Sequence, residues 1–219
     1  MAYHFHEERL AQFNDSTSAM TNPSKTELER WLACLRATYE ERDEELKDRF
    51  QRSLPFQDAM FDRWERARSL GFGDGASIYH SAQVFGQVMV GEGTWIGPYV
   101  VLDGQGATLS IGATCSISSG VHIYTHNTIR WALSGGQKEA QCAPVKIGNR
   151  SYVGSQTVIS AGVTIGEGCV IAANSFVNRE VKDSHIVGGS PATVIGKVRF
   201  EGDEPILDFN ERAFTPENR

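Results

Sequence analysis

The feature that most constrains the fold of this chain is an aliphatic residue that recurs every six positions. The register runs from Ile78 to Leu102, resumes nine residues later at Ile111, and after a second break continues from Ile147 to Val177. A period of two would indicate an ordinary strand, and a period of 3.6 a helix. A period of six indicates short strands joined by tight corners, with the aliphatic side chain in the interior. The fourteen positions are Ile78, Val84, Val90, Ile96, Leu102, Ile111, Ile117, Ile123, Ile147, Val153, Ile159, Ile165, Ile171 and Val177.

The residues between these positions support the same interpretation. Glycine often follows the aliphatic residue directly, as Gly97 and Gly112 do, and it eases the backbone geometry of a corner. A small or β-branched residue usually stands four positions after it, as Cys115 and Cys169 do. Three units close one triangular coil of about 18 residues, and stacked coils share one core. The repeat therefore predicts a mainly β chain with a parallel β-helix of about four to five coils.

The N-terminal region is built differently, because the first of the 22 glycines is Gly71. Ser24 and Glu27 form a capping-box signature, which predicts the start of a helix. Apolar residues then recur at helical spacing, at Leu28, Trp31, Leu32, Leu35, Tyr39, Leu46 and Phe50. A second helix from Pro55 to Gly71 completes the predicted α-helical hairpin. The residues that this second helix is expected to bury are Phe56, Met60, Phe61 and Trp64.

These patterns divide the chain into four parts. Residues 1–22 are expected to form a polar arm, and residues 23–76 the α-helical region. The β-helix domain spans residues 77–199 and includes an extended loop over residues 127–144. Residues 200–219 are expected to form a C-terminal tail.

Composition argues against several classes of function. A net charge of −6 disfavours binding to nucleic acid or to an anionic membrane surface. No apolar run approaches the roughly 18 residues that a membrane span requires, and the N-terminus lacks the apolar stretch of a secretory signal. The four cysteines form no CxxC pair, which indicates reduced thiols in a cytoplasmic protein.

The repeat resembles that of the hexapeptide-repeat acyltransferases, which fold as a left-handed parallel β-helix. The unit Ile147-Gly148-Asn149-Arg150-Ser151-Tyr152 matches their aliphatic–Gly–x–x–small–x pattern. The segment Gly188-Gly189-Ser190-Pro191-Ala192-Thr193-Val194-Ile195 is similar to the closing motif of the branch that acetylates maltose, galactosides and xenobiotics. The resemblance implies a homotrimer that uses acetyl-CoA as its acyl donor. We expect the helical hairpin to pack over the β-helix and to help form the trimer or the acceptor pocket.

The main break in the repeat lies between Ile123 and Val145, and such breaks are where functional loops project from a solenoid. His126 stands where the chain leaves the core, and an imidazole can take a proton from a hydroxyl near neutral pH. The resemblance implies that His126 is the general base. His122 is the alternative base, although its place in the repeat favours an outward surface position. The other histidines, His4, His6 and His185, are expected to be structural or solvated.

Two other chemistries are weighed against this base. Gamma-class carbonic anhydrases share the fold and bind zinc through three histidines, and His122 and His126 are spaced like ligands. His80, however, stands at the third position of its unit and His122 at the sixth, so they face different sides. We therefore expect no metal site. Cys142 lies in the loop without a further basic partner, so direct transfer is expected rather than an acyl-enzyme.

The resemblance also implies where acetyl-CoA binds. It places the pantetheine arm in a groove between subunits, beside Ser155 and Ala173, although both are also ordinary small corner residues. Asn178 and Arg179 replace the Thr-Lys pair that is common in the family. Together with Lys197 and Arg199, Arg179 supplies positive charge for the phosphates.

For the acceptor, Asp103 follows Leu102 at the first break in register and is expected to bind a sugar hydroxyl or to orient the base. Trp131, in the extended loop, offers a surface for a sugar ring or anchors the loop. The sequence thus predicts an O-acetyltransferase that acts on a carbohydrate hydroxyl, as in polysaccharide or glycoconjugate assembly. The alternatives are N-acetylation of an amino sugar, acetylation of a xenobiotic or antibiotic, and a non-catalytic scaffold.

Overall fold

The computed structural model describes residues 23–210. The chain divides into two compact units, with the boundary between Ala59 and Met60. His4, His6 and the expected polar arm over residues 1–22 lie outside the described residues. Within the described ranges, no helix is long and apolar enough to cross a membrane.

The first unit contains helix α2 (Lys25–Phe50), and the chain after it returns alongside its second half, where Arg42 Nε donates to the carbonyl of Ala59 at 3.2 Å. The predicted capping box is present, because Glu27 N donates to Ser24 Oγ at 3.3 Å and Ser24 N donates to Glu27 Oε2 at 2.8 Å. In the second half of the helix, Tyr39 donates its hydroxyl proton to the carbonyl of Leu54 at 2.9 Å. Leu46 is buried there. The C-terminal half of α2 is thus packed against its own chain.

The predicted second helix is in fact two short helices, α3 (Phe56–Met60) and α4 (Arg63–Ser69). Asp62 separates them, since its carboxylate accepts hydrogen bonds from the backbone of Trp64 and Glu65 and starts α4. The expected burial is wrong for the aromatic residues, because Phe56, Phe61 and Trp64 are exposed. The buried residues of these two helices are instead Asp58, Ala59 and Ala67, and Met60 is half-buried.

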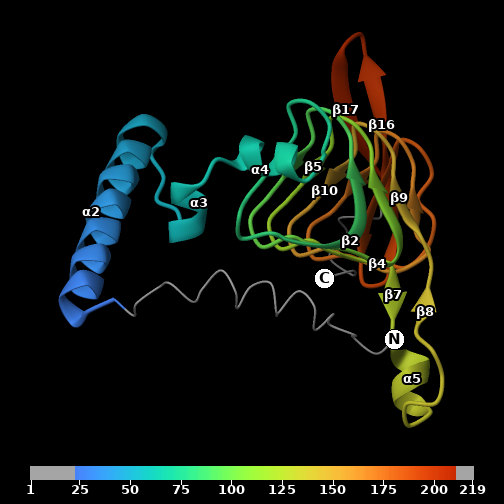
Figure 1. The fold of residues 1–219 in the computed structure, drawn as a ribbon. Helices are drawn as coiled ribbons and strands as arrows, with labels where there is room; N and C mark the ends of the chain where they lie inside the picture. The colour runs from blue at the N-terminus through green and yellow to red at the C-terminus, as the bar shows by residue number, and fades with distance from the viewer. Residues whose placement is uncertain (1–22, 211–219) are drawn as a thin grey trace. The chain divides into compact units, whose positions relative to one another are not determined.

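The second unit is a parallel β-helix whose strands repeat on three faces (Figure 1). On the first face, Ile78 pairs with Ile96, and each later rung pairs with the rung one coil further on. The strands are β1 (Ser77–Ile78), β2 (Gln83–Val90), β3 (Trp95–Ile96), β4 (Val101–Ile111), β5 (Ser116–Ile117), β6 (His122–Tyr124), β7 (His126–Asn127), β8 (Gln141–Cys142), β9 (Val145–Ile147), β10 (Tyr152–Val153), β11 (Val158–Ile159), β12 (Thr164–Ile165), β13 (Val170–Ile171), β14 (Phe176–Val177), β15 (His185–Gly189), β16 (Ala192–Glu201) and β17 (Glu204–Phe209). Each six-residue unit of the sequence repeat therefore forms one rung of the coil, as predicted.

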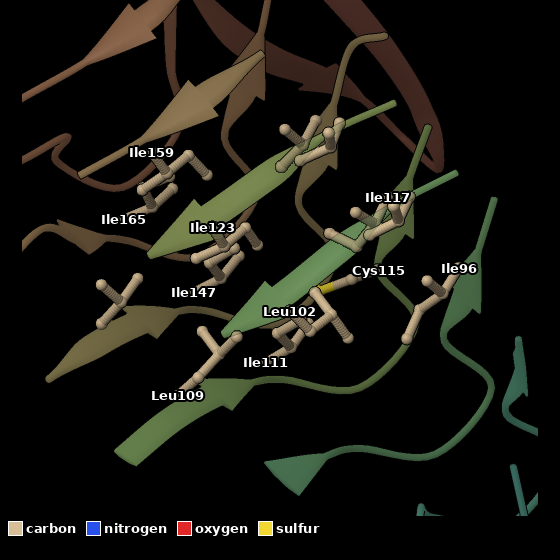
Figure 2. Close-up of a cluster of buried hydrophobic side chains, with 14 of the residues drawn as sticks. Ile96, Leu102, Leu109, Ile111, Cys115, Ile117, Ile123, Ile147, Ile159 and Ile165 are labelled. Atoms are coloured by element: carbon tan, nitrogen blue, oxygen red, sulfur yellow. The ribbon is translucent and has the colours of Figure 1, made fainter. Parts of the chain in front are cut away.

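The core is the stack of predicted aliphatic positions (Figure 2). Thirteen of the fourteen are at most 6% exposed, and Val84 is half-buried against the same cluster. Cys115 and Cys169 also point into the interior, where burial raises the pKa of both thiols. Packing thus accounts for these two cysteines, as their place in the repeat predicts.

The first break in the register lies inside strand β4, which continues through a corner of the coil. The three extra residues there follow Asp103, and Gly104 makes the closest approach to the preceding coil. A Cβ on Gly104 would lie 2.2 Å from the carbonyl oxygen of Gln87, so only glycine fits. This corner carries Asp103 at the edge of the coil, next to the point where the loop leaves.

At the other end of the β-helix, β15, β16 and β17 form antiparallel pairs on the first face. The hairpin of β16 and β17 extends beyond the coils (Figure 1, red). Part of the region expected as a tail, residues 204–209, is strand β17. It carries Asp208 opposite Lys197.

Candidate active site

The second break in the repeat forms an arm that leaves the coil after strand β6. Strands β7 and β8 pair in antiparallel fashion, with His126 opposite Cys142, and the short helix α5 (Ile129–Leu133) joins them (Figure 1). His126 is therefore the first residue of the arm, immediately after Thr125, which is fully buried. This placement holds the backbone of His126 against the core while its side chain stays 27% exposed.

The side chain of His126 lies beside a carboxylate from the neighbouring coil. Its Nδ1 atom is 3.3 Å from Oδ2 of Asp103, whose side chain is only 8% exposed. The contact is not aligned as a hydrogen bond, and Nδ1 is closed off from solvent. The other carboxylate oxygen of Asp103 accepts a hydrogen bond from Gln105 N at 3.0 Å, which fixes the carboxylate. The structure thus brings together the predicted base and one predicted acceptor-binding residue.

Thr125 ties the corner that carries Asp103 to the start of the arm. Its hydroxyl donates to the carbonyl of Asp103 at 2.8 Å and accepts from the backbone N–H groups of Gly106 and Ala107, each at 3.2 Å. Its own backbone N–H also donates to the Asp103 carbonyl, at 3.1 Å. A single buried side chain therefore sets the distance between the two elements that carry Asp103 and His126.

Gly106 lets this corner approach the arm closely. A Cβ at this position would lie 2.5 Å from Cβ of His126 and 3.0 Å from Sγ of Cys142. No side chain larger than hydrogen fits without displacing one of them. The exposed thiol of Cys142 is thus a neighbour of the candidate base. The predicted site residues did not include Thr125 or Gly106, although Gly106 lies in the three-residue insertion that breaks the register.

The alternative base, His122, lies one rung before the arm in strand β6. Its Nδ1 atom is 3.3 Å from the hydroxyl of Tyr124, and the two rings meet edge to face with centroids 6.0 Å apart. His80 is on a different face, with its ring 5.1 Å from that of Phe61. In the part of the chain that the structure describes, no three His, Cys, Asp or Glu side chains are grouped to hold a metal ion.

Trp131 lies on helix α5, away from the base of the arm. Its ring packs beside Gly136, where an added Cβ would be 3.7 Å from the indole, and it remains 53% exposed. Ile129 and Leu133 on the same helix are exposed as well. Trp131 therefore belongs to a group of exposed apolar side chains at the tip of the arm. The predicted acceptor-binding residue that lies beside His126 is Asp103.

The residues expected to bind acetyl-CoA lie in three places. Ser155 and Ala173 occupy equivalent corners of successive coils, since Asn174 N donates to the Ser155 carbonyl at 2.8 Å. Asn178 and Arg179 follow strand β14 and are exposed, and Arg179 borders a pocket of about 140 Å³. The pocket is lined by Val177, Arg179, Glu180, Val181, Val187, Ala192, Thr193 and Val194.

Lys197 and Arg199 lie further on, along strand β16. The guanidinium of Arg199 donates through Nε to Asp208 Oδ2 at 3.0 Å and lies 3.9 Å from Glu201. Its charge is thus already balanced by carboxylates of the same hairpin. Of the two predicted arginines, Arg179 therefore lies at the pocket, whereas Arg199 is paired with carboxylates.

Comparison with known proteins identifies the repeat. Residues 144–179 match the family model of the bacterial transferase hexapeptide (six repeats). Galactoside O-acetyltransferase from Escherichia coli strain K12 is 30% identical over 105 residues, which is 48% of this chain and 48% of the relative. Chloramphenicol acetyltransferase from Agrobacterium fabrum strain C58 is 44% identical over 61 residues, which is 28% of this chain and 29% of the relative. The chain thus spans less than half the length of these curated relatives.

A solved structure extends the comparison to most of the chain. A hexapeptide-repeat-containing acetyltransferase from Vibrio cholerae O1 biovar eltor, complexed with acetyl coenzyme A, is 26% identical with a TM-score of 0.50. The match covers 83% of this chain and 94% of that chain. The stacked coils and these matches make the chain similar to the hexapeptide-repeat acetyltransferases. The predicted resemblance and the left-handed β-helix are both confirmed.

Proposed function

We propose that this protein is an acetyl-CoA-dependent O-acetyltransferase that acts on a carbohydrate hydroxyl, with His126 as its general base. The observation that carries the proposal is the pairing of His126 with a buried carboxylate at the point where the repeat breaks. The relatives are named as acetyltransferases, and the Vibrio cholerae protein was solved with acetyl coenzyme A. The similarity to a galactoside O-acetyltransferase supports a sugar hydroxyl as the acceptor.

In this proposal the Asp103 carboxylate favours the tautomer of His126 with its proton on Nδ1. The second ring nitrogen, Nε2, is then free to accept the proton of the acceptor hydroxyl. The hydroxyl oxygen attacks the thioester carbonyl, the carbon–sulfur bond breaks, and the CoA sulfur leaves with the proton that the imidazole gained. General-base assistance of this kind contributes about 10²–10⁴ in rate. Asp103 therefore acts as a positioning residue for the base.

The same proposal assigns the acetyl-CoA contacts. Ser155 and Ala173 form small corners along which a pantetheine arm can lie, and Asn178 after strand β14 supplies a further polar contact. Arg179, at the pocket, and Lys197 supply charge for the phosphates, whereas Arg199 contributes less because Asp208 already pairs with it. The enzyme acts as a cytoplasmic homotrimer, and Trp131 on the arm contacts the acceptor. Exposed apolar residues on α5 support a contact of this kind.

An acceptor screen tests the proposal. The full chain is incubated with acetyl-CoA and a panel of sugars, amino sugars, xenobiotics and polysaccharides, and CoA release is measured. We expect turnover with sugars that carry only hydroxyl groups. Turnover confined to amino sugars or other amine-bearing compounds would show that the reaction is N-acetylation. Turnover confined to hydroxyl compounds other than sugars would show that the acceptor is a xenobiotic. An absence of CoA release together with no thermal stabilisation by CoA would favour a scaffold.

A further inference from the structure

Helix α2 carries an apolar seam with the spacing of a coiled coil. Leu28, Leu32, Leu35 and Tyr39 follow one another at intervals of four, three and four residues, and Leu46 continues the series seven residues later. This is the a/d pattern by which one helix packs lengthwise against another. A seam of this kind is stabilised where another apolar surface covers it.

Within the described residues of the first unit, the chain packs against the C-terminal half of this seam and leaves its N-terminal half exposed. The ring of Tyr39 packs 5.7 Å from that of Phe56, and Leu46 is 6% exposed. In the N-terminal half, Leu28 is 45%, Leu32 63% and Leu35 48% exposed in the described part of the chain. Trp31, which borders these leucines, is 60% exposed. A contiguous apolar patch of this kind marks an interaction site rather than scattered surface residues.

We propose that the N-terminal half of α2 packs in antiparallel fashion against the same segment of a second copy of this chain. In this arrangement Leu32 of each copy faces Leu35 of the other around a two-fold axis. The seam that begins as an intrachain contact at Tyr39 then continues as an interchain contact. The pairing joins two of the proposed homotrimers into a particle of six copies, and it does not rest on the proposed enzymatic activity.

The charges beside the seam favour the antiparallel direction. Glu29 and Arg36 are seven residues apart, so they lie on the same flank of the helix. Antiparallel pairing brings Glu29 near Arg36 of the second copy, and the two-fold axis creates this contact twice. Within residues 23–210, Glu29 pairs with Lys25 at 3.9 Å, and both side chains are highly exposed. Such a pair is weak and leaves Glu29 available.

Light scattering of the full chain tests the self-association. We expect Leu32→Glu to halve the number of copies per particle, because a charge in the seam breaks the two-fold contact. Ala37→Glu is the matched control, since it places the same charge on an exposed position outside the seam and is expected to leave the number unchanged. Circular dichroism of both variants checks that α2 is retained. An equal number of copies in the wild type and Leu32→Glu would overturn the proposal, because the seam would then be covered from within the chain.

A charge swap tests the direction of pairing. Arg36→Glu alone is expected to weaken association by about tenfold, because it places glutamates opposite each other twice. Adding Glu29→Arg to that variant restores the opposite charges and is expected to recover association to near the wild-type value. Failure of the double variant to recover would overturn the antiparallel arrangement. All of these variants lie outside the residues assigned to the active site, so their effects on assembly are separate from the test of function.

Discussion

The Nδ1 atom of His126 lies 3.3 Å from Oδ2 of Asp103, although the two residues belong to successive coils of the β-helix. The contact exists because both coils depart from the six-residue repeat at the same corner. One coil inserts three residues after Asp103, and the next sends out the arm that begins with His126. The geometry of the candidate site is thus produced by two irregularities that stack on one another.

Replacing the carboxylate of Asp103 with an amide tests its role as a positioning residue. We expect Asp103→Asn to lower kcat by about ten- to a hundredfold while KM for both substrates changes little, because the base is no longer held in its productive tautomer. Steady-state kinetics measure this split. A raised acceptor KM with unchanged kcat would instead assign Asp103 to acceptor binding.

The hydroxyl of Thr125 is predicted to matter more for activity than its hydrogen bonds alone suggest. Thr125→Val keeps the size of the side chain but removes three hydrogen bonds, at a cost of about 1–3 kcal/mol of stability. We also expect a loss of kcat, because the corner with Asp103 is released, and Thr125→Ser should recover most of it. Thr157→Val is the matched control, since the buried hydroxyl of Thr157 donates a hydrogen bond to the carbonyl of Ala172 at another corner. Equal kinetic losses in the two valine variants would contradict a positioning role.

The two arginines expected near acetyl-CoA should behave differently. Arg179→Ala removes a cation at the pocket and is expected to raise KM for acetyl-CoA by about tenfold. Arg199→Ala should change this KM by less than about threefold, because Asp208 and Glu201 already balance its charge. Saturation curves in acetyl-CoA at a fixed acceptor concentration compare the two. A larger effect from Arg199 would move the phosphate site to the hairpin.

Thiol modification should distinguish the four cysteines. Cys115 and Cys169 are buried with a raised pKa, so they stay protonated and unreactive at pH 8 in the folded protein. Cys34 and Cys142 are exposed and are expected to react. Alkylation with iodoacetamide should inhibit turnover, because a group on Cys142 crowds His126. Cys142→Ser should retain activity and resist inhibition, whereas Cys34→Ser should remain sensitive; inhibition of both variants alike would contradict this account.

The regular parts of the fold follow from the sequence, because each rung repeats one local requirement. An aliphatic residue every six positions is buried at every rung except Val84, which is half-buried at the start of the coil. The capping box of α2 is equally local and was equally predictable. The break at Asp62 also had a signal, since Asp62 is followed by Glu65 as in a helix start, but the apolar pattern around it concealed the break.

The sequence was enough to predict which residues form the candidate site, but not which contacts between coils hold them in place. His126 and Asp103 stood out because each stands where one of the two breaks in the register begins. The parts played by Thr125 and Gly106 depend on contacts between coils, which no local pattern encodes. Likewise, the pairing of Arg199 with Asp208 requires strand β17, and the six-residue period, which ends at Val177, gives no sign of that strand.

The central claim, that His126 is the general base, is tested most directly by the kinetics of His126→Ala. The control is His122→Ala, which removes a histidine from the preceding rung without touching the arm. With acetyl-CoA and an accepted sugar, we predict that His126→Ala loses at least about a hundredfold in kcat while its melting temperature and number of copies stay at wild-type values. His122→Ala should stay within about threefold of wild type. Normal turnover by His126→Ala would contradict the account.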